Sequence, residues 1–184
     1  MTSGMNAHPP DDDDRQRLSD WMRQHGAAVR GYVGAWVRRP DQADDLTQEV
    51  FRRAWQARAS YREQGTPRAY LLRIADRLVC DRQRRATSEV QMDAEGWKQI
   101  EPTCEVEPSR RLEQAEAAAQ LTAALDRLSP PQQRVLLLRY YGQLDFAEIA
   151  AALNCPLNTA LSHARRGLEA LRGLLSGSES RGAK

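Results

Sequence analysis

The chain has 184 residues, of which 41% are hydrophobic and 6% aromatic, and its formal net charge is +2. This composition allows modest cores, and the lack of any run of about 18 apolar residues predicts no membrane insertion. The N-terminus lacks the apolar core of a signal peptide, so we expect the protein to stay in the cytoplasm. Three scattered cysteines predict reduced thiols, with neither a disulfide frame nor a zinc site: Cys80, Cys104 and Cys155.

The small net charge hides a strong segregation along the chain. Residues 1–14 carry four Asp and no base, residues 15–85 carry 16 Arg against 8 acids, and residues 86–109 carry one Lys against six acids. A basic block of this kind indicates a polyanion as partner. The pattern predicts two folded modules, at 15–85 and 110–175, joined by a flexible acidic linker at 86–109 and flanked by disordered tails at 1–14 and 176–184.

The first module reads as helices, because its apolar residues recur at helical spacing and no segment alternates like a strand. The fold class is therefore all-α. We expect one or two helices over residues 15–38, then helices at about 42–59 and 67–85. Asp41 is a plausible N-cap after Pro40. Thr66 caps the third helix and ends the loop Ser60–Thr66, with Pro67 at the first helical position, where a missing N–H costs nothing.

The second module begins with an Ala-rich helix over residues 110–128. Two capping boxes follow, Ser129 with Gln132 and Asp145 with Glu148, and each opens a helix. Asn154 can take the left-handed C-cap conformation before the last helix, at about 157–175. A short helix, a tight turn and a longer helix form the helix-turn-helix pattern.

The stretch DDLTQEVFRRAW, residues 44–55, separates polar from apolar side chains on opposite faces of a helix. Its polar face carries Asp45, Gln48, Glu49 and Arg52. This face is either solvated or a docking face for a basic helix. A catalytic use of the carboxylates is disfavoured, because no His, metal cluster or pocket signal accompanies them.

Two further helices carry candidate DNA-binding residues. Opposite the apolar stripe of helix 67–85 lie Arg73, Asp76, Arg77, Cys80 and Arg84. Arginines without close acid partners suit phosphate contact, and the nearby Tyr61 and Tyr70 either stack on unpaired bases or lie at the edge of the core. In the last helix we expect a buried stripe of Leu161, Ala164, Leu168, Leu171 and Leu175. This leaves on the exposed side, where a helix-turn-helix reads the major groove, Thr159, Ser162, His163, Arg165 and Arg166.

Three stretches together resemble bacterial RNA polymerase sigma factors of the extracytoplasmic-function group in the sigma-70 family. They are DQADDLTQEVFRRAW, RAYLLRIADRLVCDRQRR and LDRLSPPQQRVLLLRYYGQLDFAEIAAALNCPLNTALSHARRGLEAL. The resemblance covers residues 15–85, as sigma domain 2, and 110–175, as sigma domain 4. It implies a factor that binds core RNA polymerase, recognises the −35 and −10 promoter elements and helps to melt the −10 region.

The resemblance also implies partners and roles for the candidate residues. The polymerase largest-subunit clamp helices would contact Asp44, Asp45, Gln48, Glu49 and Arg52. The −10 element would contact Tyr61, Tyr70, Arg73, Arg77 and Arg84. The −35 element would contact Thr159, Ser162, His163, Arg165 and Arg166, while the C-terminal domain also meets the polymerase flap.

Such a factor is not an enzyme and needs neither metal nor cofactor. It would work in the bacterial cytoplasm, at the nucleoid when bound to polymerase, and an anti-sigma factor is a further partner to consider. The chain departs from the family pattern in both DNA-reading helices: Asp76 and Arg77 replace Arg and Asn, Tyr70 replaces a common Trp, Asn158 replaces Gly, and His163 replaces Arg. The alternative is a stand-alone helix-turn-helix regulator, which would explain residues 129–175 and leave the acidic face at 44–49 unused.

Overall fold

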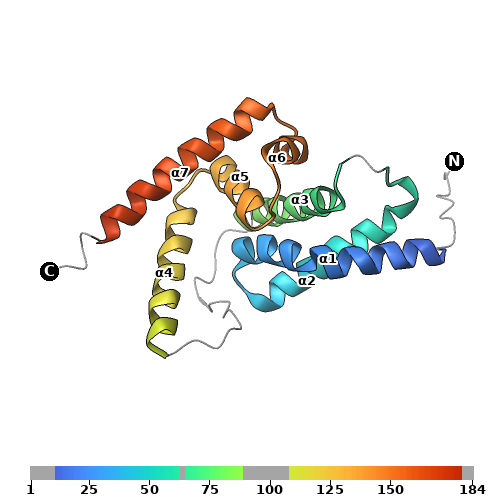
Figure 1. Ribbon diagram of the computed structural model, residues 1–184, viewed down its shortest axis with the longest axis horizontal. Coiled ribbons are helices and arrows are strands. Elements are labelled where there is room, and N and C mark those ends of the chain that lie inside the picture. The colour runs from blue at the N-terminus through green and yellow to red at the C-terminus, as the bar shows by residue number, and fades with distance from the viewer. Residues whose placement is uncertain (1–10, 63–64, 89–107, 180–184) are drawn as a thin grey trace.

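The computed structural model describes residues 11–62, 65–88 and 108–179, and these residues form helices and short turns without any strand (Figure 1). The predicted all-α fold is therefore confirmed. The N-terminal unit contains α1 (Asp12–Val37), α2 (Pro40–Gln56), a short turn of 3₁₀ helix (Arg58–Ser60) and α3 (Pro67–Ser88). The C-terminal unit contains α4 (Pro108–Asp126), α5 (Pro130–Tyr140), α6 (Phe146–Leu153) and α7 (Leu157–Glu179).

Helix α1 is one continuous helix, and it begins earlier than the sequence predicts. The Asp11 carboxylate accepts a hydrogen bond from the backbone N–H of Asp14 at 2.7 Å and so caps the helix. The aspartates of the first turn lie where the helix dipole favours negative charge. Residues 11–14 of the predicted disordered tail are thus a cap and a helical turn, while residues 1–10 lie outside the described residues. At the other end α7 continues to Glu179, beyond the predicted boundary at 175.

The junctions of the N-terminal unit follow from local backbone chemistry. Arg38 ends α1 in the left-handed conformation, with φ of 55°, and α2 then starts at Pro40. Because Pro40 occupies the first helical position, Asp41 lies inside the first turn, and the prediction of Asp41 as N-cap is wrong. The predicted cap of α3 is confirmed, since the Thr66 hydroxyl accepts a hydrogen bond from the N–H of Ala69 at 3.2 Å.

The C-terminal unit is built around its capped helices. The N–H of Ser129 donates to the Gln132 side chain at 3.2 Å. Asp145 and Glu148 exchange two hydrogen bonds, at 2.8 and 2.9 Å, so both predicted capping boxes are present. Asn154 has a φ of 52° and turns the chain from α6 into α7, which pack against each other as a helix-turn-helix.

The buried stripe of α7 differs from the predicted one. Ala160, Ala164 and Leu171 are at most 9% exposed, whereas Leu161 and Leu168 are 40% and 42% exposed. A Cβ atom on the buried Gly167 would lie 3.0 Å from the Leu136 side chain, so α5 crosses α7 closely on the stripe of small residues. The prediction of Leu161 and Leu168 as buried is therefore wrong, because the small side chains allow the closer approach and so face the core.

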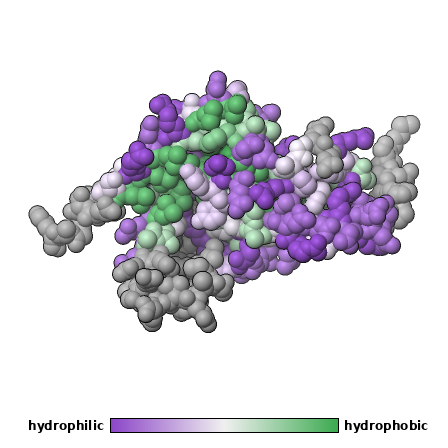
Figure 2. All heavy atoms as spheres, in the orientation of Figure 1, coloured by the Kyte–Doolittle hydropathy of each residue, from purple (hydrophilic) through white to green (hydrophobic). Residues whose placement is uncertain are grey.

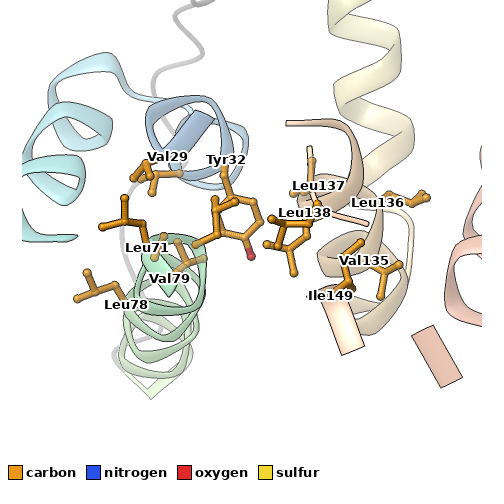
Figure 3. Packing of buried hydrophobic residues seen from close by; sticks show 14 of the residues in the cluster. Val29, Tyr32, Leu71, Leu78, Val79, Val135, Leu136, Leu137, Leu138 and Ile149 are labelled. Carbon is orange, nitrogen blue, oxygen red and sulfur yellow. The ribbon is translucent and has the colours of Figure 1, made fainter. Parts of the chain in front are cut away.

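The two units share one core. Figure 3 shows the Tyr32 ring of the N-terminal unit facing Leu137 and Leu138 of α5, and Val29, Leu71 and Val79 belong to the same buried cluster. Helix α6 packs on α3, and α5 packs on α1. The predicted linker at 86–109 overlaps the end of α3 and the start of α4, and its residues 89–107 lie outside the described part of the chain.

Candidate functional site

The polar face of α2 points away from the core. Val50 and Ala54 are at most 3% exposed on the opposite side. On the polar side Asp44, Asp45, Gln48 and Arg52 are exposed and Glu49 is half-buried. The five predicted polymerase-contacting residues therefore form one accessible strip along the helix.

The charges of this strip are partly paired within the chain. Arg52 donates two hydrogen bonds to the Glu49 carboxylate, both at 2.6 Å, and Arg53 donates a third at 2.8 Å. These hydrogen bonds lower the pKa of Glu49 to about 2, so this carboxylate stays ionised near neutral pH. The Arg30 guanidinium of α1 donates to Asp44 at 2.5 Å. Sequence reasoning did not find Arg30 or Arg53, and helical spacing from Glu49 could have indicated Arg53.

Asp45 is the carboxylate of the strip that makes no ion pair within the described residues. Beside the strip, α1 and α2 form an open apolar groove lined by Leu18, Met22, Phe51 and Trp55 and bordered by Arg52. Met22 is 50% exposed there. The strip thus combines a free carboxylate with an adjacent apolar surface, which suits a helical partner carrying both basic and apolar side chains.

The two candidate base-stacking tyrosines pack against Trp21 at the edge of the N-terminal core. The Trp21 ring centroid lies 5.0 Å from that of Tyr61 and 6.0 Å from that of Tyr70, and the two tyrosine rings are 4.7 Å apart. Both tyrosines remain half-buried. They are core-edge residues, and each keeps a partly exposed side beside the loop that precedes α3.

The arginines of α3 differ in their surroundings. Arg77 is exposed and has no ion pair among the described residues, whereas the Arg73 guanidinium lies 5.8 Å from the centre of the Tyr70 ring. Arg84 pairs with Asp81, so the prediction that these arginines lack close acid partners is wrong for Arg84. Helical spacing of three residues explains this pair.

Asp76 does not lie on the exposed face to which the sequence assigned it. It is 2% exposed, and it accepts hydrogen bonds from the Tyr32 hydroxyl at 2.7 Å and from Arg134 Nε at 2.8 Å. A second Arg134 nitrogen also binds this carboxylate. The hydrogen bonds raise the pKa of Arg134, and burial raises that of Tyr32. The departure from the family pattern at position 76 was the sequence signal for this site.

The N-terminal half of α7 presents the third candidate face. Ser162, Arg165 and Arg166 are exposed, and Thr159 and His163 are half-buried, so the expectation of an exposed His163 is only partly met. Arg165 lies 3.8 Å from Glu169, and Arg166 Nε donates to the Ser162 carbonyl at 3.3 Å. Exposed leucines accompany these residues, Leu157 and Leu161 among them. Figure 2 shows apolar surface gathered over the C-terminal unit and hydrophilic surface over much of α1 and α2.

Within residues 11–62, 65–88 and 108–179, no group of three or more His, Cys, Asp or Glu side chains is placed to hold a metal ion. None of the helices described is both long enough and apolar enough to cross a membrane.

Comparison with known proteins matches two family models, each on one unit. Residues 21–89 match Sigma-70 region 2, and residues 118–171 match Sigma-70, region 4. The chain is 31% identical over 129 residues to the ECF RNA polymerase sigma factor SigC of Mycobacterium tuberculosis, covering 70% of this chain and 68% of that relative. It is 30% identical over 168 residues to SigE of Mycolicibacterium smegmatis, covering 89% of this chain and 64% of that relative.

Two solved structures share the fold. The sigma factor RpoE of Bartonella quintana, solved with the anti-sigma factor NepR, has a TM-score of 0.68 at 19% identity, over 88% of this chain and 98% of that one. CnrH, solved with the cytosolic domain of CnrY, has a TM-score of 0.66 at 20% identity, over 89% and 90% of the two chains. The helical arrangement described above is therefore one that both RpoE and CnrH adopt.

Proposed function

Because the chain belongs to the ECF sigma factors of RNA polymerase, we propose that it binds core polymerase and directs it to promoters bearing −35 and −10 elements. One observation carries this proposal: both matched regions occur in one chain, and each presents an exposed arginine-bearing helix face. A stand-alone regulator would need only the C-terminal unit. The chain then has no catalytic role of its own, and it acts in the cytoplasm, at the nucleoid when bound to polymerase.

The α2 strip is the proposed contact with the clamp helices of the polymerase largest subunit. Asp45 and Gln48 are exposed, and Asp45 is unpaired within the described residues, so both can accept hydrogen bonds from basic side chains of a partner. Asp44 and Glu49 are held by arginines of this chain, which fixes their side chains in place. A partner arginine can join such a carboxylate, because each carboxylate offers about four acceptor positions.

The DNA contacts are divided between the units. The exposed Arg77, with Arg73 and Arg84, would hold the backbone of the −10 region, and the partly exposed Tyr61 and Tyr70 would stack on bases once the strands separate. Ser162, Arg165 and Arg166 would enter the major groove at the −35 element, with Thr159 and His163 at their border. The relatives solved with anti-sigma factors support an anti-sigma factor as an additional partner of this chain.

Charge reversal on the α2 strip tests the polymerase contact. The double variant Asp45→Arg with Glu49→Arg should lose affinity for core polymerase by roughly 100-fold or more, because attractive contacts become repulsive. The control is Asp12→Arg with Glu116→Arg, which changes the net charge equally at exposed positions outside the strip. Affinity is measured by titrating each labelled protein with core polymerase, and circular dichroism verifies that helicity is kept.

Two results would contradict the proposal. Equal affinity of the strip variant and the unaltered chain would remove the strip from the interface. A lack of any binding by the unaltered chain, with retained binding to duplex DNA, would favour the stand-alone regulator.

A further inference from the structure

Three exposed leucines line one flank of α7. Leu157 is 46% exposed, Leu161 40% and Leu168 42%. Their spacing of four and seven residues places them on one side of the helix, because 3.6 residues complete a turn. They belong to the C-terminal unit, over which Figure 2 shows apolar surface. A single exposed leucine is ordinary on a protein surface, so the position of each one relative to its polar neighbours decides what it can do.

Leu161 lies among the residues of α7 that are proposed to enter the major groove. It is the fifth residue of a helix that begins at Leu157, and the exposed Ser162 and Arg165 follow it by one and four positions. Residues four apart are neighbours on a helix face, so Leu161 adjoins Arg165. The N-terminal part of the second helix of a helix-turn-helix is the part that meets base edges. Leu161 is therefore placed to meet a base.

The packing of α7 keeps Leu161 on the surface. Ala160 and Ala164 are at most 4% exposed on the neighbouring buried stripe. A Cβ atom on Gly167 would lie 3.0 Å from the Leu136 side chain of α5. The helix cannot rotate about its axis to bury Leu161 without exposing this stripe and opening a gap against α5. The leucine thus keeps its direction when the C-terminal unit meets DNA.

A leucine can recognise only one feature of the major groove. Its side chain neither donates nor accepts a hydrogen bond. The edges of guanine, cytosine and adenine carry hydrogen-bonding groups there, whereas thymine also presents an apolar methyl group. A leucine pressed against a polar base edge displaces water without replacing the lost hydrogen bonds, which weakens binding. Against a thymine methyl group it buries two apolar surfaces, which favours binding.

We propose that Leu161 reads the methyl group of a thymine in the duplex that α7 recognises, and that this contact sets the base preference at one position. The inference rests on the proposed function for identifying that duplex as a −35 element. It deepens that function, because Ser162, Arg165 and Arg166 supply hydrogen bonds and phosphate contacts, whereas Leu161 supplies an apolar contact. Leu168 lies about 10 Å further along the helix, outside the reading half.

The test removes one methyl group from the DNA at a time. The complex of core polymerase and the intact chain selects its preferred duplex from a randomised pool. Each thymine of the upstream element is then replaced by deoxyuridine, which keeps every hydrogen-bonding group of thymine and lacks only the methyl group. At the thymine read by Leu161, this replacement should weaken binding by about fourfold, the contribution of burying one methyl group. Titration of labelled duplexes with the complex gives the affinities.

Variants of the chain identify the residue responsible. In Leu161→Ala the shorter side chain does not reach the methyl group, so the thymine and deoxyuridine duplexes should bind within about 1.5-fold of each other. Leu161→Met keeps an apolar side chain of similar volume and should retain most of the difference. Leu168→Ala is the matched control, since it removes the same atoms at nearly the same exposure and should keep the whole difference. Circular dichroism verifies that each variant keeps its helicity.

Three results would overturn the proposal: no upstream thymine at which deoxyuridine weakens binding, a difference that persists in Leu161→Ala, or a difference that is also lost in Leu168→Ala. A persistent difference with Leu161→Ala and Leu168→Ala equally weakened on both duplexes would assign the leucine flank to a protein partner instead of a base.

Failure of the proposed function has a different signature, in which polymerase with the chain selects no upstream element. The selection and the titrations are then repeated with the intact chain alone. The difference that depends on Leu161 is still expected there, because a stand-alone helix-turn-helix reads bases with the same helix. A chain that selects no duplex in either form would overturn both proposals.

Discussion

At the scale of single residues, charges that lie on the surface and charges that lie in the interior have different consequences in this protein. Glu49 is surrounded by Arg52 and Arg53 on an accessible helix face, where its ion pairs add little to stability and mainly orient the side chain. Asp76 is buried, and each of its hydrogen bonds replaces water that it has lost. Substitutions at the two sites should therefore affect different properties.

The Glu49 carboxyl should titrate near pH 2, because Arg52 and Arg53 lower its pKa from the ordinary value of 4.5. A folded-state pKa below the unfolded one gives a contribution that is present above about pH 4.5 and is lost as pH falls toward 2. Carboxyl-carbon NMR on the folded chain measures this midpoint. Arg52→Ala should raise it, and an ordinary midpoint in the unaltered chain would show that these hydrogen bonds do not form in solution.

Tyr32→Phe should lower the free energy of unfolding by about 1.5–3 kcal/mol, because the variant removes a buried hydrogen bond to a charged group and keeps the ring packing. Urea unfolding followed by circular dichroism gives the difference. Tyr140→Phe is the matched control, since Tyr140 is 63% exposed and its hydroxyl can bind water. Equal stability of the two variants would mean that the Tyr32 hydroxyl does not contribute to the Asp76 site.

At the scale of elements, close helix approach depends on small residues at the crossing points. Gly167 allows α5 to approach α7, and Gly142 lets the chain turn directly beside Leu72 of α3. The same requirement explains why α7 buries Ala160 and Ala164 and leaves Leu161 and Leu168 partly exposed. The leucines are thus available for contacts outside the chain.

Gly142→Ala should destabilise the protein by about 1–3 kcal/mol, because its Cβ would lie 2.6 Å from the Leu138 carbonyl oxygen and 2.8 Å from Leu72. Gly173→Ala makes the same substitution at a helical position with open space around it. That variant should be more stable by roughly 0.5–1 kcal/mol, because Ala favours the helix. The urea unfolding midpoints of both variants measure these changes in stability. A Gly142→Ala midpoint equal to that of the unaltered chain would argue against the close packing of this turn.

At the scale of the whole molecule, patterns among residues that are close in the sequence predicted the helices well. The Thr66 cap, the two capping boxes and the Asn154 turn depend on residues a few positions apart, so the sequence carries them directly. The polar strip of α2 was predicted for the same reason, because one helical period defines it. Its role in binding polymerase stays a prediction.

Features that depend on distant residues could not be predicted in this way. The Asp76–Arg134 pair spans 58 positions, and helical spacing alone placed Asp76 among exposed arginines. The buried stripe of α7 was mispredicted because hydrophobicity favoured leucine, whereas the crossing with α5 requires small side chains. Both errors arise where tertiary packing overrides the local pattern.

The central claim, that one chain directs polymerase by reading an upstream duplex and a melted downstream segment, is tested most directly by transcription. Core polymerase with each variant is assayed on a fully paired promoter and on the same promoter with its −10 region already unpaired. Arg166→Ala should weaken apparent promoter binding by about 1–3 kcal/mol on the paired template, and transcription from that template should fall accordingly. On the unpaired template the loss should be much smaller. Tyr61→Leu keeps an apolar contact with Trp21 but removes the stacking ring, which is worth roughly 1–3 kcal/mol per base. It should spare upstream binding and impair opening of the paired template. An Arg166→Ala defect that persists undiminished on the unpaired template, or normal opening by Tyr61→Leu, would contradict this division of roles.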